Sequence, residues 1–246
     1  MIDTHAHLDA CEDAPTDVVR RAREAGVSRI IAIGSGVESS RAAVALAEQE
    51  DGVYAAIGIH PHQAAEDEPF ELIRRLFASA CAVAVGETGL DFYRDYAPRG
   101  AQRRLFERHL ELAAELGKAV VVHSRAAAED TASALAGFDG PVVFHCFSEP
   151  ELLPVALERG YYVSFAGNVT YPNAADLRRA AADVPPGRIL AETDSPYLAP
   201  QPCRGRANEP AFVIHTLEAL ATARGDDAGE LEAHIDANAT TAFNLP

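Results

Sequence analysis

The feature that most constrains the fold is a regular alternation of short apolar runs and helical segments along the chain of 246 residues. The runs have the length and the β-branched content of buried strands. The predicted strands cover residues 2–7, 27–33, 53–59, 82–87, 119–122, 141–144, 161–165 and 189–193. The predicted helices cover residues 15–25, 38–50, 68–79, 98–116, 129–135, 151–159, 210–224 and 230–242, with a short one after residue 173. This alternation predicts a parallel (β/α)8 barrel (a TIM barrel), with a doubly wound open sheet as the alternative.

The length suits one barrel, so we expect residues 1–246 to form a single domain. Four widely spaced cysteines, without a C-x-x-C pair or a signal peptide, indicate a soluble, cytoplasmic protein. No apolar run reaches membrane-spanning length, and no segment indicates an obligate protein partner. The net charge of −16 argues against a broad basic surface, so a polyanionic substrate would need bound cations.

Chemically active side chains gather at the ends of the predicted strands, where barrels place their active sites. Of nine histidines, six lie there: His5, His7, His60, His62, His123 and His145. Glu87 and Asp194 end the fourth and the eighth strand. The other three histidines, His109, His215 and His234, lie in predicted helices and are interpreted as packing or surface residues.

Imidazoles and carboxylates at one end of a barrel predict a metal centre. The candidate ligands exceed what one ion requires, and they are His5, His7, Glu87, His123, His145 and Asp194. We therefore expect two divalent ions, for which zinc or manganese fits the mixed ligands and magnesium stays open. Glu87 is the expected bridge, because each of its oxygens can bind one ion. Two ions about 3.5 to 4 Å apart would activate a water and stabilise a displacement at phosphorus.

Five motifs follow one another along the chain: DTHAHLD at residues 3–9, GIHPH at 58–62, GETGLD at 86–91, HCFS at 145–148 and ETDSPYL at 192–198. Together they closely resemble the TatD family of metal-dependent deoxyribonucleases, from residue 2 to the segment 238–243. The resemblance implies a metal-dependent hydrolase barrel, a pair of divalent metals and phosphodiester hydrolysis on DNA, here expected at single-stranded ends. It implies one metal site on His5, His7, Glu87 and Asp194, and a second on Glu87, His123 and His145.

Three positions depart from the usual pattern of that family. Ala126 stands where the family usually has Asp, Ala119 where it has Pro, and Glu149 where Gly is common. No candidate ligand is lost. Because Ala126 and Glu149 border the expected mouth, we expect them to affect substrate preference more than activity.

Several residues receive roles as hypotheses. Asp194 is the expected general base beside the metals, and a helix N-cap is its competing interpretation. Arg125 is expected to pair with a phosphate oxygen, against an ordinary ion pair with a neighbouring acid. The other candidate substrate contacts are His62, Asp91, Tyr93 and Arg206, and ordering of the loop is the alternative role for Asp91 and Tyr93.

Some flanking residues are given supporting roles. Glu192, which shares strand parity with Asp194, is expected to orient a ligand. Tyr197 is either a stacking surface for a base or a core aromatic. His60, which precedes Pro61, is interpreted as structural.

Two other functions remain open at this point. One is an amide or lactone hydrolase on the same barrel, since a metal-activated water attacks carbonyl carbon as well as phosphorus. Many dinuclear relatives of that kind bridge their metals with a carboxylated lysine, but the single lysine, Lys118, precedes a strand. The other is a noncatalytic metal-dependent interaction protein, which would need ligands without open positions.

Overall fold

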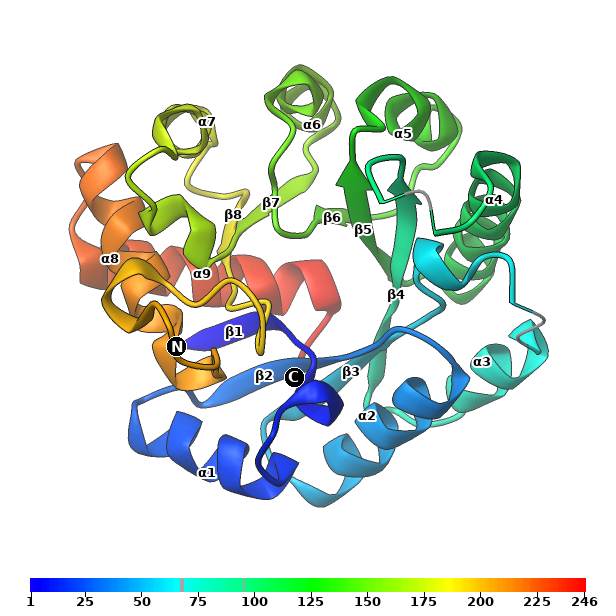
Figure 1. Cartoon of the computed structure of the whole chain (residues 1–246), viewed down its shortest axis with the longest axis horizontal. Coiled ribbons are helices and arrows are strands. Elements are labelled where there is room, and N and C mark those ends of the chain that lie inside the picture. The colour runs from blue at the N-terminus through cyan, green and yellow to red at the C-terminus, as the bar shows by residue number, and fades with distance from the viewer. Residues whose placement is uncertain (67–68, 95) are drawn as a thin grey trace.

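The computed structural model describes residues 1–66, 69–94 and 96–246. Its strands form one eight-stranded parallel sheet in sequence order, with helices around it (Figure 1). The strands are β1 (Ile2–Ala6), β2 (Arg29–Gly34), β3 (Val53–Ile57), β4 (Ala82–Asp91), β5 (Ala119–Arg125), β6 (Val142–Phe144), β7 (Tyr162–Phe165) and β8 (Ile189–Ala191). The predicted (β/α)8 barrel is therefore confirmed.

The barrel closes between β1 and the segment that follows β8. The Asp194 N–H donates to the His5 carbonyl at 3.0 Å, and the His7 N–H donates to the Ser195 carbonyl at 2.8 Å. Ala6 and Ser195 form a parallel bridge at the same place. These backbone bonds bring Asp194 beside the two histidines of β1.

Helices cover the outside of the barrel and one of its ends. They are α1 (Pro15–Glu24), α2 (Val37–Gln49), α3 (Phe70–Leu76), α4 (Arg99–Leu116), α5 (Ala128–Leu135), α6 (Leu153–Arg159), α7 (Ala175–Asp183), α8 (Val213–Arg224) and α9 (Ala228–Phe243). From α9, Asn238 Nδ2 donates to the Ile189 carbonyl at the start of β8, and Thr240 Oγ1 accepts from Arg29 at the start of β2. Thus α9 covers the amino-terminal ends of the strands. Within the described residues, no helix combines the length and the apolar character needed to cross a membrane.

Strand β4 is longer than predicted. It continues past Glu87 to Asp91 because residues 89–91 pair with residues 123–125 of β5. Gly89 makes this close approach possible, since a Cβ there would lie 2.0 Å from the His123 carbonyl oxygen and its φ is +133°. Glu87 therefore lies within β4, at the register irregularity between Val85 and Thr88, and not at the end of the strand. Helix α3 is shorter than predicted, and the expected start at residue 68 lies outside the described residues.

His109 on α4 is a packing histidine, as predicted. It is fully buried, its Nε2 accepts from the Ile59 N–H at 3.0 Å, and its Nδ1 bonds the Leu105 carbonyl at 2.8 Å. The imidazole therefore fastens α4 to the segment after β3, which carries His60 and His62. Burial lowers the pKa of His109 to about 4.

This depressed pKa predicts a pH-dependent loss of stability. The unfolded chain takes up the proton below its ordinary pKa of 6.5, whereas the folded chain resists protonation down to about 4. The stability of the wild type is therefore independent of His109 protonation above pH 6.5 and should fall by about 3 kcal/mol as the pH falls toward 4. His109→Leu should cost about 1–3 kcal/mol at neutral pH, because the Ile59 N–H loses its acceptor.

Urea unfolding at a series of pH values measures this effect. The free-energy difference between the wild type and His109→Leu should shrink on acidification, whereas exposed His234→Leu should give a constant difference. A wild-type-to-His109→Leu difference that does not change with pH would contradict this account of the imidazole.

Candidate metal centre

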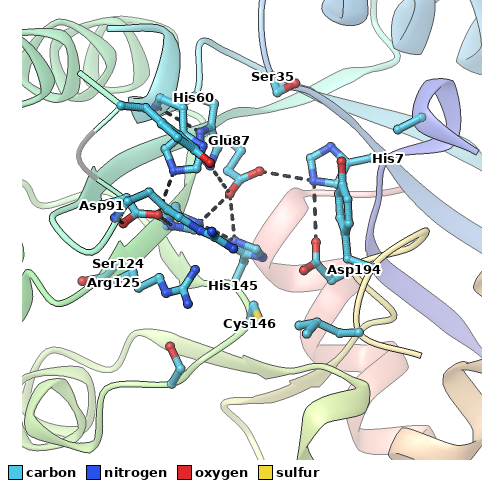
Figure 2. A pocket seen from close by; sticks show the side chains of 18 of the residues that line it. His7, Ser35, His60, Glu87, Asp91, Ser124, Arg125, His145, Cys146 and Asp194 are labelled. Atoms are coloured by element: carbon cyan, nitrogen blue, oxygen red, sulfur yellow. Dashed lines mark hydrogen bonds and ion pairs between the residues drawn. The ribbon is translucent and has the colours of Figure 1, made fainter. Parts of the chain in front are cut away.

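A cavity of about 770 Å³ opens at the carboxyl end of the barrel (Figure 2). Its lining includes eight of the residues that the sequence singled out: His7, His62, Glu87, Asp91, His123, Arg125, His145 and Asp194. His5 is fully buried, with its Nε2 3.2 Å from that of His7. The structure thus brings all six predicted metal ligands to one place.

Glu87 lies at the centre of this cluster and is 2 % exposed. Its Oε2 faces β1, 3.5 Å from His5 Nε2 and 3.4 Å from His7 Nε2. Its Oε1 faces β5 and β6, 2.9 Å from both His123 Nδ1 and His145 Nε2. The two carboxylate oxygens therefore face two different sets of imidazoles.

Asp194 completes the first of these sets. Its Oδ1 lies 3.6 Å from His7 Nε2 and 3.7 Å from His5 Nε2. Its backbone has a φ of +55°, in the left-handed region that non-glycine residues rarely occupy. Asn208 stabilises this turn, because its Nδ2 donates to the carbonyls of Thr193 and Tyr197. Asp194 is thus fixed at the wall of the cavity, opposite Arg125 and Asp91 in Figure 2.

The donor set fits a pair of divalent cations. Nitrogens of different imidazoles approach to 3.2 Å between His5 and His7, and again between His123 and His145. Two lone pairs at that distance repel unless a proton or a cation lies between them. Three overlapping groups have all their ligand atoms within 4.8 Å of one another: His5, Glu87 and His145; His5, His7 and Asp194; and His60, Glu87 and His123.

Electrostatics in the cluster favour bound positive charge. Burial opposes ionisation of Glu87, but His145, His60 and His123 outweigh it and hold its pKa well below the usual range. Burial also opposes a charge on His7, yet Asp194 and Glu87 raise its pKa to about 10. The ionised carboxylates raise the pKa of His7, His123 and His145 against the opposing effect of burial, whereas burial keeps the pKa of His5 and His60 low. Metal ions would have to displace protons from the first three imidazoles, as ligation requires neutral imidazole.

Neighbouring acids orient the imidazoles. Glu192 Oε1 lies 3.1 Å from His145 Nδ1 and accepts the Cys146 N–H at 2.8 Å, so it orients His145 as expected. Asp91 Oδ2 lies 2.8 Å from His62 Nε2 and 3.4 Å from His123 Nε2. Such partners fix the ring orientation and leave the other nitrogen free to bind a metal.

His60 is the functional candidate that sequence reasoning missed. Its Nε2 lies 3.3 Å from Glu87 Oε1, and burial lowers its pKa to about 4, so the ring is neutral and able to ligate. The available signal was the H-x-H spacing of His60 and His62 after a predicted strand, which His5 and His7 also show. Because Pro61 follows His60, the sequence favoured a structural role for His60 instead.

The predicted substrate residues divide into two groups. Arg125 lines the cavity, with its Cζ 4.1 Å from the Tyr93 ring centroid. Within the described ranges no carboxylate forms an ion pair with Arg125, so the competing interpretation lacks a partner there. Arg206, by contrast, lies over Phe212 and lines a separate cavity of about 280 Å³ near α1. The structure therefore does not bring Arg206 to the metal centre.

Glu149, which stands where the TatD-like pattern commonly has Gly, connects two loops at the mouth of the cavity. Its Oε1 accepts the Ala127 N–H at 3.0 Å, and its Oε2 accepts a short hydrogen bond from the Ser124 hydroxyl. Ala126 between them has a φ of +51°. The carboxylate therefore fixes the turn that carries Arg125 at the cavity wall.

A parallel barrel with a histidine and carboxylate cluster at its carboxyl end defines the class of metal-dependent hydrolase barrels. Residues 2–244 match the family model of TatD related DNases, and the chain belongs to the TatD family. It is 36 % identical to a metal-dependent hydrolase, TatD, of Mycobacterium tuberculosis, over all of this chain and 98 % of the other. It is 39 % identical over both full lengths to a protein of Erwinia tasmaniensis named 3′-5′ ssDNA/RNA exonuclease TatD.

Solved structures give the same result. The crystal structure of YjjV, a TatD homologue from Escherichia coli, superposes with a TM-score of 0.93 at 31 % identity, covering all of this chain and 98 % of that one. A TatD family hydrolase from Entamoeba histolytica superposes at 0.86 with 19 % identity, which supports the fold alone.

Proposed function

We propose that the protein hydrolyses phosphodiester bonds at the ends of single-stranded DNA, with two divalent cations held on either side of Glu87. The observation that carries this proposal is the Glu87 carboxylate, whose two oxygens face separate imidazole sets at the base of an open cavity. His5, His7 and Asp194 would hold one ion, and His123 and His145 the other, with His60 near the second. The name of the Erwinia relative supports a nucleic-acid end as substrate.

Divalent cations at these positions supply Lewis-acid stabilisation of the phosphate charge and lower the pKa of an attacking water. Asp194 is the expected general base, because its buried carboxylate lines the cavity and His7 helps to keep its pKa low against the opposing effect of burial. The attacking water forms a bond to phosphorus while the bond to the leaving sugar oxygen breaks. The proton passes from the water to Asp194 and then to the leaving oxygen.

Arg125 and His62 provide the contacts for the rest of the phosphate and its nucleotide. The Arg125 guanidinium lines the cavity, stacked on Tyr93, and can pair with a nonbridging oxygen. His62 lines the same wall and is held by Asp91. Asp91 is 1 % exposed and also accepts the Tyr93 and Arg94 N–H groups, so we propose that it positions the loop and the histidines.

The structure gives less support to the alternative function, hydrolysis of an amide or a lactone. Lys118 precedes β5, whose other end carries His123, and its Nζ lies 5.9 Å from the Phe77 ring centroid. A carboxylated lysine therefore cannot bridge ions beside Glu87. The noncatalytic alternative does not account for an open cavity lined by the Asp194 carboxylate and by Arg125, which pairs with no carboxylate among the described residues.

A comparison of substrates on one metal-loaded sample tests the proposal. We expect the protein to shorten single-stranded oligothymidylate stepwise from one end, and to leave a dipeptide and a lactone intact. Labelling each end in turn gives the polarity, which we expect to run from the 3′ end, as the name of the relative indicates. Turnover of the dipeptide or the lactone with intact DNA would contradict the proposed function.

A further inference from the structure

The connection between β4 and α4 carries two exposed tyrosines beside the cavity. Tyr93 is 65 % exposed and Tyr96 is 64 % exposed, and Tyr96 lines the cavity directly. The Tyr96 ring packs edge-on against His62, with ring centroids 4.7 Å apart. Exposed aromatic faces next to a site for a nucleic-acid end suit the stacking of unpaired bases.

Arginines lie close to Tyr93 and to the neighbouring Phe92. The Arg94 guanidinium carbon lies 5.9 Å from the Tyr93 centroid, on the same ring that Arg125 approaches. Arg99, at the start of α4, lies 4.4 Å from the Phe92 centroid. In the described part of the chain, none of these three arginines forms an ion pair with a carboxylate. In a protein with a net charge of −16, these side chains form a local positive rim that is available to phosphates.

The opposite rim of the cavity is acidic. Tyr197 is exposed there by 55 %, and Asp9 and Asp194 line the same side. The Tyr197 ring packs edge-on against His7, with ring centroids 5.8 Å apart, and His7 Nε2 lies 3.6 Å from Asp194 Oδ1, so this ring lies on the side of Asp194. A polyanion would be repelled along that side and attracted along the other.

Hydrogen bonds also hold described residues beside the tyrosines. Asp91 Oδ1 accepts the Tyr93 and Arg94 N–H groups, both at 2.9 Å. Fully buried Gln102 donates to the carbonyls of Asp91, which precedes Tyr93, and Ala97, which follows Tyr96. Ordering these residues beforehand lowers the entropic cost of binding a strand across them.

We propose that single-stranded DNA leaves the metal centre over this loop, with bases stacked on Tyr96 and Tyr93 and phosphates paired with Arg94, Arg99 and Arg125. This inference rests on the proposed function and adds the path of the strand. It assigns Tyr93, Arg94, Tyr96 and Arg99 as a binding site for the nucleotides beyond the scissile one. A consequence is that the protein should prefer longer strands to dinucleotides.

The test compares kcat/KM for a thymidine dinucleotide with that for an oligothymidylate of about ten nucleotides. Wild-type protein should favour the longer substrate, and Tyr96→Ala should lower the ratio of long to short by about tenfold, through loss of one stacked base. Arg94→Ala should also lower the ratio, and Tyr96→Phe should keep it. Arg75→Ala on α3, which does not line the cavity, serves as the control, for which we expect the wild-type ratio, and Tyr197→Ala tests the acidic rim.

The outcomes separate this inference from the proposed function. If the wild type cleaves both substrates and Tyr96→Ala keeps the wild-type ratio, the strand path is overturned and the nuclease assignment stands. If Tyr197→Ala lowers the ratio instead, the strand leaves by the acidic rim and the inference is again overturned. If the wild type cleaves neither substrate, both proposals fall. Dinucleotide cleavage by each variant shows that its metal centre is folded.

Discussion

Replacing Asp194 with Asn should lower kcat on single-stranded DNA by about 10²- to 10⁴-fold while the protein stays folded. The amide keeps the size of the carboxylate and can still contact His7 and His5, but it cannot accept a proton from water. The change lies in a segment fixed by backbone bonds to β1, so the fold should persist. Steady-state kinetics at saturating metal, with thermal unfolding as a check on folding, measure the effect.

Asp9→Asn is the matched control for this substitution. Asp9 lines the same cavity and loses the same charge, but it lies outside the predicted ligand groups. We expect it to stay within a few-fold of the wild type. Equal activity of Asp194→Asn and wild type would rule out Asp194 as the general base.

Replacing Glu87 with Gln should abolish binding of metal at one or both positions. The amide carries no negative charge, and only its single carbonyl oxygen can ligate, so it cannot serve the imidazoles on both sides. Substitution of residues that only orient metal ligands lowers metal affinity by about 10- to 100-fold. Substitution of the ligand Glu87 should therefore lower metal affinity by at least as much. Elemental analysis of dialysed protein measures metal content directly and does not depend on activity.

The same substitution should destabilise the metal-free protein. Glu87 is the buried counter-charge for His145, whose pKa it helps to raise well above 6.5 against the effect of burial. Breaking a buried pair on one side costs about 3 kcal/mol. Exposed Glu38→Gln on α2 should change the free energy of unfolding by less than about 0.5 kcal/mol. Unchanged metal content in Glu87→Gln would rule out the shared carboxylate.

The fold was largely predictable because its signals are local. Apolar runs and helical periodicity give the order of strands and helices, and order alone restricts the topology to a few choices. The length of β4 was not predictable in this way. It depends on pairing with β5 past Glu87, which Gly89 permits through a close approach between strands. Such contacts are properties of the assembled sheet.

The site was predictable where residues are attached to strands. His5, His7, His123 and His145 meet because the carboxyl ends of parallel strands meet at one end of the barrel. Side chains on long connections do not follow that rule. Arg206 was expected at the cavity, yet it lies over Phe212 elsewhere, since loop packing decides its position.

Anomalous scattering from crystals grown with manganese tests the central claim most directly. The account predicts two peaks in the cavity, one beside Glu87 Oε2 near His5 and His7, and one beside Glu87 Oε1 near His123 and His145. A single peak, or peaks that leave Glu87 without a metal on each side, would contradict it.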